Sequence, residues 1–153
     1  MSRSIYPTGR PWVPQARRRY VPGVVSGDVT APVLSSPVGT ATGSTTATVG
    51  ATTDEGNGTL YAVVTVSGTP PTPTQIAAGQ DNSGSAAAWA GSVSVGSTGA
   101  KTLPATGLAV ATAYYTHLYH DDAAGNDSNV VSSAQFTTNA ASGALLKLMS
   151  YFH

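Results

Sequence analysis

The clearest alternation of side chains lies between Ala113 and Tyr119, where the chain reads Ala-Tyr-Tyr-Thr-His-Leu-Tyr. Every second residue falls on the same side of an extended chain, so two sets separate: Tyr115, His117 and Tyr119, and Tyr114, Thr116 and Leu118. A period of two predicts a strand with two different faces.

A turn that contains Leu108 precedes this strand, and Tyr114 is its first large residue. In β-sandwiches such a Tyr packs its ring in the core and turns its hydroxyl back onto the chain just upstream. We therefore predict that Leu108 and Tyr114 form a structural corner between two sheets.

Similar stretches elsewhere predict further strands. We expect strands near Val33–Ser36, Thr46–Thr53, Thr59–Ser67, Ala88–Val95, Lys101–Leu103, Ala113–Tyr119 and Val130–Thr137. Asp54–Gly58, between the second and third strands, has the composition of a hairpin-type turn. The pattern predicts an all-β fold, an antiparallel β-sandwich.

One short helix is expected between the third and fourth strands. Thr72 would be its N-cap, Pro73 its first residue, and Gln75 the reciprocal cap that bonds back to Thr72. Gly79 would end it.

Residues spread along the chain carry a family resemblance. They are Asp28–Pro32 at the start, Ser44–Val49 in the second strand, Thr53–Glu55 after it, Leu108, Thr112 and Tyr114 at the corner, Ala123–Asn126 in the last hairpin and Phe136–Thr138 in the final strand. With them, the region from Asp28 to Thr138 resembles the fibronectin type III family in its bacterial and phage form. The resemblance implies an Ig-like sandwich that serves as a binding or spacer module with no conserved chemistry.

Ala51 departs from the family pattern, because many members carry a core Trp at this position. Protein interiors pack at nearly crystalline density, so another side chain must occupy that volume. We expect Trp89 or Tyr61 to fill it.

Charge is scarce and unevenly distributed. Only 9% of the 153 residues are charged, and the chain contains no Cys, which excludes disulfides and thiol chemistry. Residues 1–27 carry five Arg and no acid, a net charge of +5, whereas residues 28–153 carry −5. The sequence therefore predicts a basic arm (1–27), a sandwich (28–138) and a linker with an apolar tail (139–153).

The arm contains Pro7, Pro11, Pro14 and Pro22, which favour an extended segment over a helix or a central strand. We expect it to dock on an acidic protein surface, with aromatic anchors and arginines that pair with carboxylates. The docking residues are Trp12, Arg17, Arg18, Arg19 and Tyr20. Nucleic-acid binding and a merely solvated arm are the alternatives.

The tail ends in Leu-Leu-Lys-Leu-Met-Ser-Tyr-Phe-His, with six large apolar residues in nine. Helical spacing places Leu145, Leu148, Met149 and Phe152 on one face, which slightly favours a helix over a strand. We expect this face to insert into a partner subunit. Packing back onto its own sandwich is the alternative.

No residue set predicts catalysis or a cofactor. His117 and His120 are three apart on a strand and face opposite sides, and no third ligand is suitably spaced. Asp121–Asp127 lacks the alternating oxygens of a calcium loop. No nucleophile elbow or phosphate-binding glycine loop is present. We predict a protein that is not an enzyme and that has neither a metal nor a cofactor.

The sequence shows no signal peptide and no membrane-spanning stretch, so we expect assembly in a host cytoplasm. The predicted function is a structural virion protein of a tailed phage, which decorates or stabilises the capsid or the tail. Its partners would be capsid or tail subunits, in several copies per particle, with a host-surface glycan as a further partner and neither nucleic acid nor membrane. The alternative is a carbohydrate- or surface-binding module of a bacterial extracellular system.

Overall fold

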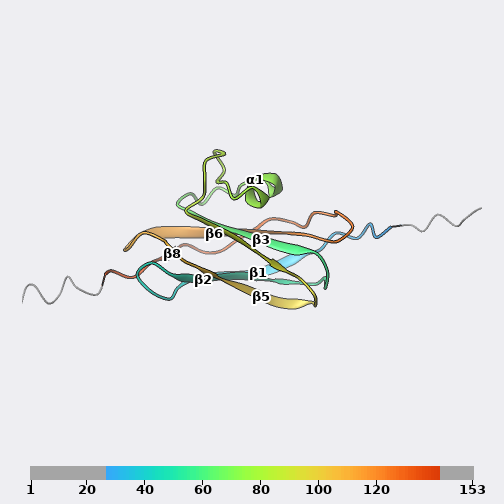
Figure 1. Ribbon diagram of the computed structural model, residues 1–153, viewed down its shortest axis with the longest axis horizontal. Coiled ribbons are helices and arrows are strands. Elements are labelled where there is room, and N and C mark those ends of the chain that lie inside the picture. The colour runs from blue at the N-terminus through green and yellow to red at the C-terminus, as the bar shows by residue number, and fades with distance from the viewer. Residues whose placement is uncertain (1–26, 142–153) are drawn as a thin grey trace, which may run out of the picture.

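The computed structural model of the chain describes residues 27–141. These residues form strands and one short helix (Figure 1). In chain order the elements are β1 (Leu34–Ala41), β2 (Ala47–Thr53), β3 (Thr59–Thr65), α1 (Pro73–Ala77), β4 (Trp89–Ser94), β5 (Gly99–Ala105), β6 (Ala113–Asp121), β7 (Val131–Ser132) and β8 (Phe136–Thr137). None of the helices in this range is long and apolar enough to cross a membrane.

The strands form two facing sheets. One has the order β1-β2-β5, and the other has the order β4-β3-β6-β7, with β8 also paired to β6. Every pairing is antiparallel. Figure 1 shows the two layers edge-on, with β1, β2 and β5 below β3 and β6. The prediction of an all-β antiparallel sandwich is confirmed.

The main core lies between the sheets, and alternate residues of each strand supply it. On β3, Leu60, Ala62 and Val64 belong to this core, whereas Val63 faces the other side and packs with Ile76 of α1. Full burial of each large aliphatic side chain stabilises the fold by roughly 1.5–3 kcal/mol. The alternation of side chains read from the sequence therefore matches the alternation between core and outer face in the strands.

The volume left by Ala51 is filled from β4 rather than from β3. Ala51 is buried, and Trp89 packs against the same core. The Trp89 ring lies over Gly91, where an added Cβ would come within 2.6 Å of it. Tyr61 lies on the outer face of its sheet, stacked on Tyr119. Of the two expected candidates, Trp89 is the one in the core.

The expected strands differ from the structure at one or both ends, most of all the first and the last. β1 continues to Ala41, past a register shift between Ser35 and Val38, and the Asn129 side chain bridges the backbone N–H and C=O of Leu34. The expected strand Val130–Thr137 is broken into β7 and β8. Ser133 explains the break, because its hydroxyl accepts from the Thr116 N–H and so replaces a main-chain ladder bond.

The hairpin predicted at Asp54–Gly58 is wrong. β2 and β3 belong to different sheets, so this segment carries the chain across the sandwich. Gly58 has φ of +90°, and an added Cβ would lie 2.1 Å from the Asp121 carbonyl oxygen. A turn composition indicates a change of direction but does not tell which sheet the chain enters next.

The helix α1 lies outside the sandwich, on the outer face of the sheet that contains β3 and β6 (Figure 1). Thr72 accepts from the Gln75 N–H at 3.3 Å, and the Gln75 side chain accepts from the Thr72 N–H at 2.9 Å. This capping box, with Pro73 at the start and Gly79 at φ +71°, confirms the predicted helix.

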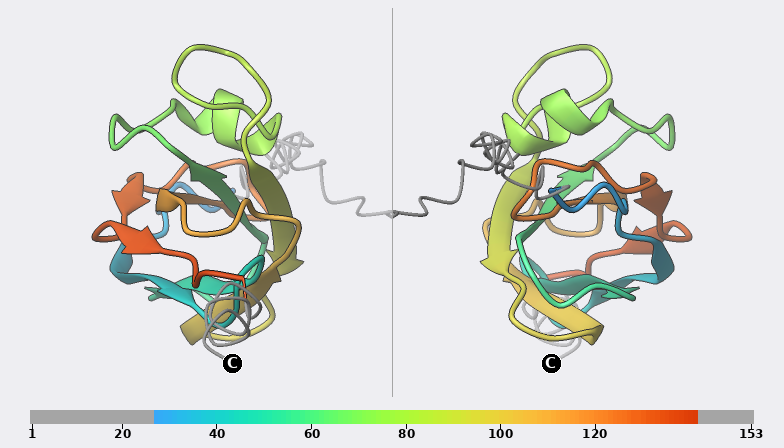
Figure 2. Two further views of the ribbon diagram at one scale, coloured as in Figure 1. Left: turned by 90° about the vertical axis from the view of Figure 1, so that its left-hand side faces the viewer. Right: turned by 90° about the vertical axis from the view of Figure 1, so that its right-hand side faces the viewer.

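The described chain enters and leaves the sandwich at opposite ends of its long axis. Figure 1 shows the first described segment (blue) at one end and the last (red) at the other, and the end-on views of Figure 2 agree. The first and the last described residues are therefore separated by the length of the sandwich.

Candidate functional site

The corner before β6 joins the two sheets. The Tyr114 hydroxyl accepts a hydrogen bond from the Ala109 N–H at 3.0 Å, and both Leu108 and Tyr114 are only 3% exposed. The Tyr114 ring lies 6.1 Å from that of Phe136 on β8. The Thr138 hydroxyl donates to the Ala109 carbonyl oxygen at 2.6 Å. This is the geometry of a tyrosine corner, and it serves the architecture rather than any chemistry.

His117 is fully buried on the outer face of β6. Its Nε2 lies 3.1 Å from the Ser67 carbonyl oxygen and its Nδ1 lies 2.7 Å from Ser132 Oγ. A carbonyl oxygen can only accept, so Nε2 carries the proton and donates it. Burial lowers the pKa of His117, which keeps the ring neutral.

His120 is fully buried on the opposite face of the same strand. Its Nε2 donates to the Asn57 carbonyl oxygen at 2.6 Å, and its Nδ1 lies 2.9 Å from Thr53 Oγ1. The ring therefore fastens the crossing between β2 and β3 onto β6. The two histidines face opposite sides, as the sequence predicts, and do not share a site.

The loop after β6 is organised by Asp122. Its carboxylate accepts from the N–H groups of Ala124 and Asn126 and from the Asn126 side-chain amide. The bond from the Asn126 N–H is the main reason that the pKa of Asp122 lies below its usual value, against the opposing effect of burial. These bonds hold the loop as a turn.

Three carboxylates meet beside this turn. One oxygen each of Asp28, Glu55 and Asp122 lies within 4.8 Å of the others, a donor set that suits a hard cation. Spacing along the sequence did not predict this group, because its members come from three distant segments. Glu55 already accepts from the Asn57 side chain at 2.6 Å, and Asp122 accepts three hydrogen bonds within its turn.

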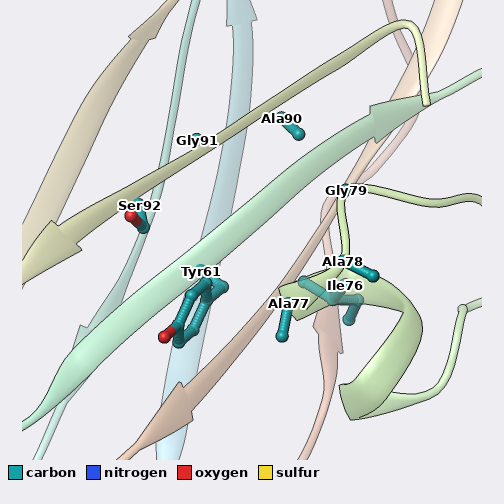
Figure 3. A pocket seen from close by; sticks show the side chains of 8 residues that line it. All are labelled: Tyr61, Ile76, Ala77, Ala78, Gly79, Ala90, Gly91 and Ser92. Carbon is teal, nitrogen blue, oxygen red and sulfur yellow. The ribbon is translucent and has the colours of Figure 1, made fainter. Parts of the chain in front are cut away.

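A hollow of about 280 Å³ opens between α1 and the outer face of β3 and β4 (Figure 3). It is lined by Tyr61, Ile76, Ala77, Ala78, Gly79, Ala90, Gly91 and Ser92. The small residues of β4 leave this space, and no hydrogen bond found within residues 27–141 occupies the hydroxyl of Tyr61 or Ser92. The hollow can therefore take a small group that is mainly apolar with one or two polar atoms.

Sequence reasoning did not locate this hollow. The capping box of α1 predicted a helix at this place. It did not indicate which strand face the helix covers. The predicted docking residues lie outside the described residues: Trp12, Arg17, Arg18, Arg19, Tyr20, Leu145, Leu148, Met149 and Phe152.

The order β1-β2-β5 against β4-β3-β6-β7, together with the tyrosine corner, decides the type of sandwich. The fold is fibronectin type III-like.

A similar solved structure is the solution structure of the fibronectin type-III domain of human fibronectin type III domain containing protein 3. It has 22% identity and a TM-score of 0.40, over 78% of this chain and 96% of that one. No family model matches the chain. No curated protein matches it either.

Proposed function

We propose that the chain is a non-enzymatic structural protein of a tailed-phage virion, which decorates or stabilises the capsid or tail and is anchored through both termini. The observation that carries the proposal is that the described chain begins and finishes at opposite ends of the sandwich (Figure 1). A module with this arrangement can bridge two attachment points. A scaffold of this kind says little about function by itself, so the residues of the flanking segments supply the further support.

Charge supports anchoring of the arm to a partner. Residues 28–141 carry seven acids and a single Lys, and the arm carries five Arg. The sandwich and the arm are thus opposite in charge, and the arginines can pair with carboxylates on a neighbouring subunit. The tail adds apolar side chains, which favour burial in a partner over exposure to water. Both segments suit attachment to protein, in several copies per particle.

The test is docking of the full chain onto particles that lack it, at a series of salt concentrations. Changing Arg17, Arg18 and Arg19 together to Ala should weaken docking and remove most of its salt dependence. Exposed charge pairs are screened over about 10 Å at moderate ionic strength. Truncation after Gly143 should weaken docking equally at all salt concentrations, because apolar burial contributes about 25 cal/mol per Å² regardless of charge. Lys101→Ala, a basic residue on the sandwich, is the matched control and should dock as the parent does.

The alternative is a carbohydrate- or surface-binding module of a bacterial extracellular system. The hollow favours it, since Tyr61 offers a ring for stacking and Ser92 a hydroxyl beside it. Glycan binding that is lost in Tyr61→Ala, with no docking on particles, would favour this alternative.

A further inference from the structure

Each sheet of a sandwich ends in two edge strands, and an unpaired edge is a template for another chain. Here the edges are β1 and β5 in one sheet, and β4 and the β7–β8 segment in the other. Natural proteins protect such edges with Pro, Lys, bulges or very short strands.

Three of these four edges carry such protection. β1 contains Pro37 and shifts its register between Ser35 and Val38. β5 contains Lys101 and Pro104. β7 and β8 are two residues long each.

Within its bounds the edge strand β4 carries none of these features, although just before it the Ala88 N–H also donates to the Val64 carbonyl oxygen opposite Trp89. It runs for six residues, Trp89–Ser94, in unbroken register with β3, and it contains no charge and no Pro. Among the sheet edges of residues 27–141, this one remains open to pairing.

The register shows which main-chain groups are free. The Val95 N–H donates to the Gly58 carbonyl oxygen at 2.9 Å, and hydrogen-bonded pairs alternate along an antiparallel ladder. Trp89, Gly91 and Val93 therefore point their main-chain groups toward β3. Ala90, Ser92 and Ser94 point theirs toward the open edge. Ala90 and Ser92 also line the hollow beside α1, so a strand added here would have a pocket for one of its side chains.

We propose that the open edge of β4 binds the C-terminal segment Ala144–His153 of a second copy of this chain as an added strand, with one apolar side chain in the hollow. This inference rests on the proposed role of the tail as a docking segment and names its partner.

The choice of segment follows from its residues. Ala144–His153 contains neither Pro nor Gly, so every residue can donate a main-chain hydrogen bond, and its ten residues exceed the six of β4. Its apolar side chains suit the hollow. Residues 1–26 are interrupted by four Pro, and their longest stretch free of Pro and Gly, Gln15–Val21, carries three Arg.

In the bound state we expect the tail to be an extended strand, in place of the helix that its spacing favours. A strand added to an edge gains its main-chain bonds from the partner, so the partner selects this conformation. Association should therefore increase the strand signal in circular dichroism or infrared spectra. A gain of helix on association would overturn the proposal.

The experiment measures self-association of the purified full chain by sedimentation velocity over a range of concentrations. Ser92→Pro removes an outward N–H and leaves the ladder with β3 intact, and Ser92→Lys places a charge on the edge without removing that N–H. Both should weaken association on the order of tenfold or more, the effect of losing about 1.4 kcal/mol or more. Ser92→Thr keeps the N–H and should associate as the parent does.

A complementation test identifies the two partners. Chains truncated after Gly143 keep the edge but lack the tail, and Ser92→Pro chains keep the tail but lack the edge. Each should be monomeric alone, and an equal mixture should form a mixed dimer. A monomeric parent at all concentrations, full association of Ser92→Pro, association of the truncated chain, or a mixture that stays monomeric would each overturn the proposal. No particle is present, so the outcome is independent of docking to a virion.

Discussion

At the scale of single residues, the buried polar groups of this sandwich connect segments that the core alone would leave loose. Tyr114 holds the corner, His117 joins β6 to the end of β3, and His120 joins it to the crossing between β2 and β3. The Tyr114 hydroxyl and both imidazole rings have hydrogen-bond partners, which offsets the cost of removing them from water.

Removing the Tyr114 hydroxyl should leave the Ala109 N–H without its acceptor. We expect Tyr114→Phe to lower the free energy of unfolding by on the order of 1 kcal/mol. Tyr114→Ala should lower it by about 3–5 kcal/mol through the cavity that it leaves. Tyr115→Phe, on the half-exposed neighbour, is the control and should be neutral. Urea denaturation measures all three, and a Tyr114→Phe variant as stable as the parent would contradict the corner.

His117 should make stability depend on pH. Burial depresses its folded-state pKa below the ordinary value of 6.5, so the unfolded chain binds a proton first as the pH falls. The free energy of unfolding should therefore decrease as the pH falls through 6.5 toward the folded-state pKa. We expect His117→Gln to flatten this slope in urea denaturation at a series of pH values. An unchanged slope would mean that another group causes it.

At the scale of elements, the sequence predicted most strands and the single helix because these depend on local patterns. The alternation from Ala113 to Tyr119 reports two faces of β6, and the Thr72–Gln75 pair reports a helix start. The errors arose where a distant group decides the outcome. Ser133 interrupts the last strand through Thr116 on β6, and the segment Asp54–Gly58 crosses between sheets whose pairing no local pattern contains.

The helix α1 has only five residues, so its cap should matter. We expect Thr72→Ala to reduce the free energy of unfolding by about 1 kcal/mol, because an exposed helix N–H loses its acceptor. Thr74→Ala, an exposed Thr inside the same helix, is the matched control and should be neutral or slightly stabilising. Hydrogen exchange of the Ile76–Gly79 amides should accelerate only in Thr72→Ala. Equal exchange in both variants would show that packing on β3 alone holds the helix.

At the scale of the whole molecule, the fold brings together groups that no sequence spacing relates. The carboxylates of Asp28, Glu55 and Asp122 meet in this way, and so do α1, β3 and β4 around the hollow. This is why the type of fold could be predicted and the candidate surfaces could not. The predicted docking residues lie beyond residues 27–141, so their role stays a prediction.

Calcium should not stabilise the protein. Hydrogen bonds already hold the carboxylates of Asp122 and Glu55 in place, so the loop does not need an ion to organise it. We expect the melting temperature to be the same with calcium and with a chelator. An increase with calcium that disappears in Asp28→Asn would show that the three carboxylates form a cation site.

The central claim is that the termini attach this protein to a particle and that the sandwich bridges between them. The most direct measurement is the number of copies that particles incorporate of the full chain and of a fragment spanning Asp28–Asn139. The fragment contains the core and the corner, so it should fold, which a cooperative thermal transition would verify. We predict that particles incorporate the full chain and exclude the folded fragment. Full occupancy by the fragment would contradict the account and show that a face of the sandwich is the binding surface.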